Sequence, residues 1–173
     1  MAEVTADRLP AGMTYQAYEQ LLRAYAELRP EEAPSGEENE HRLHGPINLQ
    51  RALRIWRTYM PSPALTTLLT ALTAEQEWMV LTEVWCGDSV QSIPTMARLA
   101  ALSPHIHLRI LLRDQHADIM DQYRTEGKRS IPKLVVFAAD GRELFRWGPR
   151  PAGAQAILDL AIAEGLPKQT RLE

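Results

Sequence analysis

Apolar residues in the first part of the chain recur at the spacing of amphipathic helices. Thr14 can cap a helix whose apolar side chains follow that spacing: Tyr18, Leu21, Leu22, Tyr25 and Leu28. This helix is expected to end near Arg29, because the residue before a proline avoids helical backbone. A second helix is predicted to begin near Asn48. A third is predicted behind Ser62-Pro63, a cap followed by proline at the first helical position.

From about residue 77 the pattern changes to short apolar runs of strand length that alternate with helical patterns. Strands are predicted at residues 78–85, 107–112, 133–137 and 143–147, and helices at 89–102, 118–124 and 151–164. Asp140-Gly141 between the last two strands is typical of a hairpin turn. The first three strands with their crossover connections predict a parallel part, and the hairpin adds an antiparallel edge. The fold class is therefore α/β with a mixed sheet.

Between these two parts lies an acidic segment rich in proline and glycine, at about residues 30–46, which has little to bury and reads as a linker or surface loop. We divide the chain into a helical N-terminal extension, residues 1–75, and a second unit, residues 76–168.

Composition and charge exclude several functions. The 173 residues are 45% hydrophobic and 24% charged, which is ordinary for a globular protein. The net charge of -3 argues against a nucleic-acid partner, which usually requires a basic face. No apolar run is long enough for a membrane span, and the first residues do not resemble a signal peptide. We expect a cytoplasmic protein.

The single cysteine, Cys86, excludes an internal disulfide and a cysteine-rich zinc site. It is placed where the first predicted strand gives way to a helix. Unpaired N–H groups and the dipole at a helix start favour thiolate, which is the nucleophilic form. Gly87 would let the backbone turn and a partner approach, whereas the carboxylate of Asp88 opposes ionisation. We expect an exposed, reactive thiol; the alternative is a cysteine that only fills the core.

Two prolines sharpen this interpretation. Pro94 falls inside the predicted helix after Cys86, where proline is costly unless the fold requires a kink. Pro132 begins the third predicted strand, and a cis peptide before it would explain its location.

With these features, residues 78–164 resemble the thioredoxin-like superfamily. More narrowly, the chain is similar to a group of uncharacterised bacterial thioredoxin family proteins. They share Trp-Cys-Gly-Asp, Leu-Leu-Arg-Asp at 111–114, Arg-Ser-Ile-Pro at 129–132 and Trp-Gly-Pro-Arg-Pro at 147–151. The resemblance implies a three-layer α/β/α sandwich with a mixed sheet, here behind an α-helical N-terminal extension. It also implies a substrate-binding surface of Trp85, Gly87, Ile131 and Pro132, with the cis-proline against the sulfur of Cys86 and the Ile131 backbone paired with an extended peptide.

Two positions depart from the family pattern. Ser89 stands where the second cysteine would be, and Val80 where many thioredoxins carry a buried acid. Ser89 would either donate a hydrogen bond to the thiolate or point to water. Asp88 would either stabilise the helix start or orient a substrate. Glu83 would either serve as the proton acceptor or face solvent.

We predict a monothiol redox protein, a thiol–disulfide oxidoreductase without a resolving cysteine, in which Cys86, Ser89 and Asp88 form the catalytic group. Its partner would be a disulfide- or thiol-containing protein, or a low-molecular-weight thiol that resolves the mixed disulfide. The alternatives are a non-catalytic peptide-binding module and a glutaredoxin-like carrier of glutathione or an iron–sulfur cluster, to which Cys-Gly-Asp-Ser bears some likeness.

Three further expectations complete the hypothesis. No cofactor is predicted. His105, His107 and His116 lack acidic or sulfur partners at ligand spacing, so no metal site is predicted. The chain could form a homodimer through its N-terminal helices.

Overall fold

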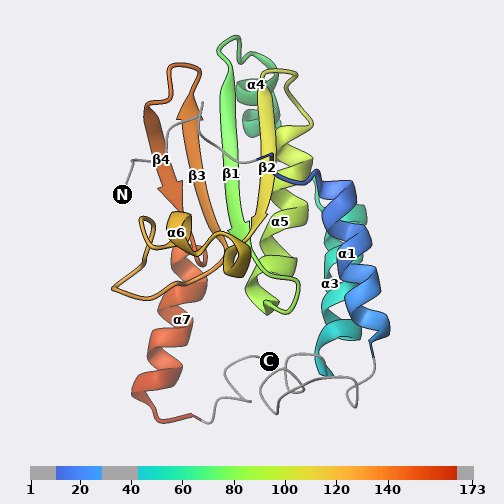
Figure 1. The fold of residues 1–173 in the computed structure, drawn as a ribbon, viewed down its shortest axis with the longest axis vertical. Coiled ribbons are helices and arrows are strands. Elements are labelled where there is room, and N and C mark those ends of the chain that lie inside the picture. The colour runs from blue at the N-terminus through green and yellow to red at the C-terminus, as the bar shows by residue number, and fades with distance from the viewer. Residues whose placement is uncertain (1–10, 29–42, 167–173) are drawn as a thin grey trace.

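The fold is built on a four-stranded mixed sheet, seen in a computed structural model that describes residues 11–28 and 43–166 (Figure 1). Most of the predicted acidic linker lies outside the described residues. The strand order is β2-β1-β3-β4. The strands are β1 (Gln76–Thr82), β2 (Ile106–Leu112), β3 (Lys133–Ala138) and β4 (Glu143–Trp147).

Helices precede, connect and follow these strands. They are α1 (Tyr15–Glu27), α3 (Gly45–Thr58), α4 (Pro63–Thr70), α5 (Gly87–Ala100), α6 (Ala117–Met120) and α7 (Ala152–Ala163). The predicted caps of α1 and α4 are confirmed, because the Thr14 and Ser62 side chains accept backbone N–H groups of the first turns. Helix α3 begins before the predicted Asn48, with a proline in its first turn.

The direction of β3 corrects the prediction of three parallel strands. β1 and β2 are parallel and joined through α5, but β3 is antiparallel to β1. The expected helix at 118–124 is only the short α6, so the segment after β2 contains no helix long enough to carry the chain back along the sheet. The chain therefore enters β3 from the end at which β1 and β2 finish.

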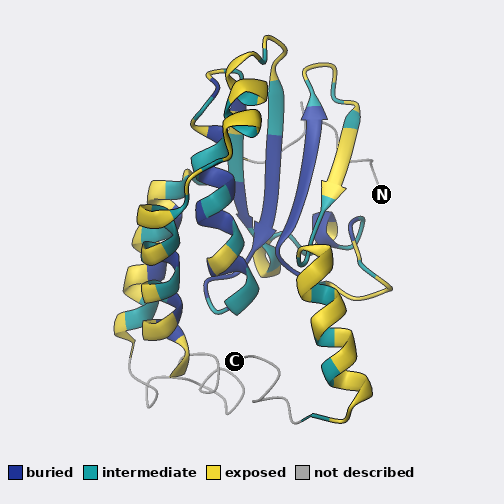
Figure 2. Cartoon of the chain, turned by 180° about the vertical axis from the view of Figure 1, so that it is seen from behind, coloured by how far each residue is buried: buried dark blue, intermediate teal, exposed yellow. Residues whose placement is uncertain are grey.

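Two hydrophobic clusters fill the two faces of the sheet. The first lies under α5 and includes Trp78, Val80, Val90, Ile93, Ile110 and Val136. The second lies on the opposite face and includes Met79, Leu81, Cys86, Met120, Ile131 and Phe137. The alternation of side chains along β1 and β3 produces this division. Figure 2 shows that β1 and β3 are buried over most of their length.

The helices of the N-terminal extension pack on the same core as the sheet. Tyr18 and Leu22 of α1 and Ala52 of α3 are buried members of the first cluster. Figure 1 shows α1 and α3 side by side, next to α5. The extension therefore contributes directly to the surroundings of the α5 N-terminus.

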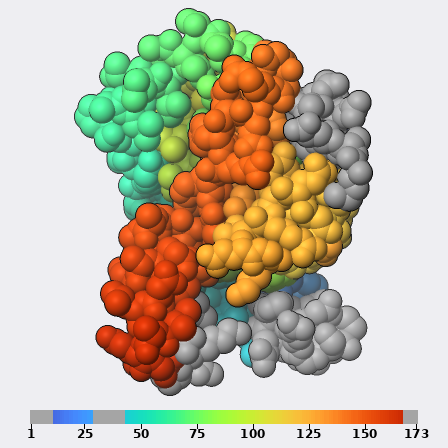
Figure 3. Space-filling model, turned by 90° about the vertical axis from the view of Figure 1, so that its left-hand side faces the viewer, coloured from blue at the N-terminus to red at the C-terminus, as the bar shows by residue number. Residues whose placement is uncertain are grey.

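Helix α7 differs from the other long helices because none of its residues is buried. It projects beyond the end of the sheet (Figure 1), and the space-filling view shows it below the β3–β4 hairpin (Figure 3). Its exposed apolar side chains include Ile157, Leu160 and Ile162. Within residues 11–28 and 43–166, no helix has the length and apolar character that crossing a bilayer requires.

Candidate functional site

Cys86 lies at the junction between β1 and α5. The strand ends at Thr82 rather than at the predicted Trp85, and the chain turns so that the Cys86 N–H donates to the Glu83 carbonyl over 3.3 Å. Cys86 is the N-cap of α5, with extended backbone, and its carbonyl accepts the N–H of Val90. The predicted placement of the cysteine at a helix start is confirmed.

The sulfur faces the loop that precedes β3. Cys86 Sγ donates to the Ile131 carbonyl oxygen over 3.5 Å. The peptide bond between Ile131 and Pro132 is cis. The structure thus brings together the cysteine and the proline loop, which are separated by 45 residues in sequence.

The exposure of Cys86 differs from our expectation. Only 8% of the residue is exposed, because it packs into the second cluster with Ile131 and Trp85. Burial raises the pKa of the Cys86 thiol, and the charge of Asp88 adds to the rise. The nearby Ser89 hydroxyl and the N–H groups of Ser89 and Asp88 lower the pKa, but burial outweighs them. The prediction of an exposed thiol was therefore wrong.

Ser89 does not point to water, since the residue is 0% exposed. Its Oγ is buried and has no hydrogen-bond partner among the described residues. The hydroxyl instead acts on Cys86, where it favours the ionised form. A hydroxyl that lacks an acceptor beside a thiol gains one when the thiol becomes a thiolate. Ser89 is thus placed to stabilise the charged state selectively.

Asp88 forms an ion pair with Arg150, whose Nη2 lies 2.5 Å from Asp88 Oδ2. Both side chains are partly exposed. Arg150 follows β4, so the pair links the first turn of α5 to the segment before α7. The guanidinium partly compensates the negative charge that opposes ionisation of Cys86.

Glu83 is buried, so the solvent-facing alternative was wrong. Its Oε1 accepts the backbone N–H of Asp114 over 2.9 Å. Burial is the main cause that raises the pKa of the Glu83 carboxyl. The side chain therefore connects the turn before Cys86 to the end of β2.

Trp85 is covered on one side by a guanidinium. The Arg113 Cζ lies 5.0 Å from the Trp85 ring centroid, at cation–π distance. Arg113 also donates from Nη1 to the Arg129 carbonyl over 3.3 Å. It thereby links the tryptophan to the segment that leads to Ile131.

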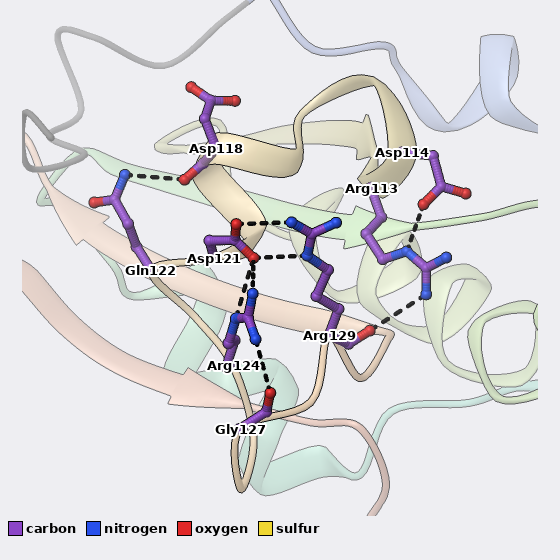
Figure 4. A network of polar contacts seen from close by, with 8 residues as sticks. All are labelled: Arg113, Asp114, Asp118, Asp121, Gln122, Arg124, Gly127 and Arg129. Carbon is purple, nitrogen blue, oxygen red and sulfur yellow. Dashed lines mark hydrogen bonds and ion pairs between the residues drawn. The ribbon is translucent and has the colours of Figure 1, made fainter.

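The segment between α6 and β3 is held by a network of hydrogen bonds and ion pairs around Asp121 (Figure 4). Its carboxylate accepts hydrogen bonds from the guanidinium groups of Arg124 and Arg129. These two groups lower the pKa of Asp121 to about 2. This network occupies residues that were expected to extend the helix to 124, and it fixes the approach to the proline loop.

Gly148 supports the other side of the proline loop. Its φ is +115°, and a Cβ atom there would lie 2.1 Å from the Pro132 carbonyl oxygen. The close approach of these two backbones requires glycine. Gly87 has no such requirement, because the nearest atom to a Cβ there is Asn48 Oδ1 at 3.9 Å. The expected role of Gly87 in permitting a tight turn was therefore wrong: it lies in regular helix.

The sequence analysis did not identify Asn48 as part of the site. Its side chain, on α3, donates from Nδ2 to the Trp85 carbonyl over 3.1 Å. The signal that could have found it is a polar residue on the apolar face that Leu49 and Ala52 share.

Two of the three histidines, His105 and His107, do have an acidic partner, contrary to our expectation. His105 and His107 each approach the Glu75 carboxylate at 2.6 Å. No group of three or more histidine, cysteine or acidic side chains suited to a metal ion occurs in the described parts of the chain.

Comparisons with known proteins agree with this fold. Solved structures similar to the chain include a protein of unknown function from Pseudomonas aeruginosa, with 22% identity, a TM-score of 0.56, and 89% of this chain and 81% of that chain covered. An HIV epitope scaffold is similar at 21% identity and a TM-score of 0.50, with 88% and 89% covered. No curated protein matches. The family model for thioredoxin matches residues 36–164, well over half of the sequence, and the chain therefore belongs to the thioredoxin family.

Proposed function

We propose that the protein exchanges thiols and disulfides through the single thiol of Cys86. The observation that carries this proposal is the position of Sγ. It lies at the start of α5, 3.5 Å from the Ile131 carbonyl that precedes the cis-proline. Membership of the thioredoxin family supports a redox role.

The groups around the sulfur have opposing effects on the ionisation of the thiol. The N–H groups of Asp88 and Ser89 and the Ser89 hydroxyl all favour the thiolate, whereas burial favours the thiol. The resting protein would therefore hold a protonated thiol that loses its proton when a partner or a higher pH shifts the balance. A raised pKa also makes the thiolate, once formed, intrinsically more nucleophilic.

The exchange has two steps. The Cys86 thiolate attacks one sulfur of a disulfide, a Cys86–substrate disulfide forms, and the other sulfur leaves as a thiolate that takes up a proton. Because the chain contains no second cysteine, an external thiolate must then attack the substrate sulfur of this mixed disulfide. That attack releases the Cys86 thiolate and a new disulfide between the external thiol and the substrate.

Incubation with glutathione disulfide tests the proposal. Intact-mass measurement should show one glutathione bound per chain, which reduced thiol then removes. The Cys86→Ser variant should gain no mass. A native wild-type chain that gains no glutathione at pH 7 to 9, but does so after unfolding in guanidinium, would contradict the proposal.

The burial of Cys86 favours a second candidate, a peptide-binding module in which the thiol only fills the core. The pKa of the thiol is raised, as it is for buried structural cysteines. Cys86→Ser separates the two functions. A partner retained in affinity capture by both wild type and variant supports the module, whereas a partner retained only by wild type and released by reductant supports thiol exchange.

A further inference from the structure

Asn48 connects the N-terminal extension to the loop that carries the thiol. The residue lies on α3, is 1% exposed, and its side chain faces the start of α5. Its Nδ2 donates to the carbonyl oxygen of Trp85, the residue directly before Cys86. A buried amide donor holds its acceptor in place, because the amide has no water to bond instead. Asn48 therefore has a strong influence on the position of this loop.

Two buried oxygens near the base of Cys86 have no hydrogen-bond partner among the described residues: Asn48 Oδ1 and Ser89 Oγ. Asn48 Oδ1 lies next to Gly87, 3.9 Å from the position of a Cβ there. Ser89 acts on Cys86 itself. Buried polar groups are usually paired, so these two oxygens leave acceptor capacity beside the start of α5 that the described residues do not fill.

Tyr18 adds a third polar group from the extension. The residue is fully buried on α1. Burial is the main cause that raises the pKa of its hydroxyl; the Thr82 hydroxyl lowers it, and the charge of an ionised Cys86 raises it. Tyr18 and Asn48 are thus buried polar residues that α1 and α3 contribute to the side of the sheet on which α5 packs.

We propose that the N-terminal extension is part of the thiol site and that Asn48 is a positioning residue for Cys86. This inference rests on the proposed function. The Asn48 amide fixes the Trp85 carbonyl and with it the Trp85–Cys86 peptide. That peptide sets the distance from Sγ to the N–H groups at the start of α5.

The amide acts on the ionised state in two ways. It holds the sulfur in line with the N–H groups of Asp88 and Ser89, which stabilise negative charge. It also places the positive end of an N–H dipole on the Trp85 carbonyl oxygen, one residue before the sulfur. Both effects favour the thiolate, so removal of the amide should raise the pKa of Cys86 further.

The rate of alkylation by iodoacetamide, measured against pH on the full chain, tests this inference. Cys86 is the only cysteine, so every label reports on it. Asn48→Leu removes the amide at similar size. The matched control is Ala52→Gly, one turn later on α3, where a buried methyl group is lost without any hydrogen bond. Urea unfolding measures the stability of both variants, and Asn48→Ala replaces Asn48→Leu if the leucine variant does not fold.

We expect Asn48→Leu to slow alkylation at pH 7 by about two- to fivefold and to move the midpoint to higher pH by less than about one unit, because the bond to the Trp85 carbonyl exists in both protonation states and only its difference between them counts. Ala52→Gly should keep the wild-type midpoint. An unchanged midpoint in the Asn48 variants, or an equal shift in the control, overturns the inference while leaving thiol exchange intact. A wild-type chain that is alkylated only when unfolded overturns the proposed function and this inference together.

Discussion

Replacement of Gly148 by alanine tests how closely the two loops beside Cys86 are packed. A Cβ atom at this position would lie 2.1 Å from the carbonyl oxygen of Pro132 and 3.3 Å from the Lys133 Cα. Real Cβ contacts essentially never fall below 3.0 Å. The oxygen belongs to backbone, so relief requires movement of the whole proline loop rather than of one side chain.

Two costs add in this variant. Overpacking of a well-filled site costs about 1–3 kcal/mol. A φ of +115° is unfavourable for any residue with a Cβ, at about 1–3 kcal/mol. We therefore expect Gly148→Ala to lower the free energy of unfolding by about 4 kcal/mol, the middle of the summed range, which is a large part of the roughly 5–15 kcal/mol of a typical domain.

Two other glycines separate these costs. Gly127 has a φ of +76° but no atom within 4 Å of a Cβ, so Gly127→Ala measures backbone strain alone, about 1–2 kcal/mol. Gly153 lies in α7 with open space around it, and Gly153→Ala should be neutral or stabilising by up to about 1 kcal/mol. Urea unfolding followed by tryptophan fluorescence gives all three values. A Gly148 variant within about 1 kcal/mol of the Gly127 variant would refute the close packing of the loops.

Further predictions concern charges near the site. Asp88→Asn removes a charge that raises the pKa of Cys86, so alkylation at pH 7 should accelerate by about two- to fivefold. Arg150→Ala removes the partner of that charge and should slow alkylation. Equal rates in both variants would contradict the electrostatic argument. The pKa of the Glu83 carboxyl is higher in the folded state than in the unfolded state. The contribution of Glu83 to the free energy of unfolding is therefore fully present below the unfolded pKa and is lost as pH rises through the folded pKa. Relative to Glu83→Gln, wild type should therefore lose stability in urea unfolding as pH rises above the ordinary glutamate pKa, and a constant difference would count against the burial of this carboxyl.

Features governed by neighbouring residues could be predicted from the sequence. Thr14 and Ser62 cap their helices through contacts three residues away. The hairpin follows from Asp140 and Gly141: the Asp140 side chain accepts the Arg142 N–H, and Gly141 has a φ of +86°. These interactions need only local chain geometry, which a sequence motif specifies.

Features governed by distant residues could not be predicted in the same way. The helix start at Cys86 indicates donors that favour a thiolate, but the opposing burial involves Ile131, 45 residues further along the chain. The direction of β3 depends on how short α6 is, and α6 ends where Asp121 pairs with arginines further along the chain. Asn48 joins the site over a separation of 37 residues, which no local pattern encodes.

The reaction of the native chain with Ellman's reagent tests the central claim most directly, because this disulfide requires a thiolate attacker and reports it as a coloured product. We predict one equivalent released per native chain, at a rate that rises with pH to a midpoint above that of an ordinary cysteine, and none from Cys86→Ser. Release only in guanidinium, with a silent native chain at every pH, would contradict the assignment of Cys86 as the working thiol.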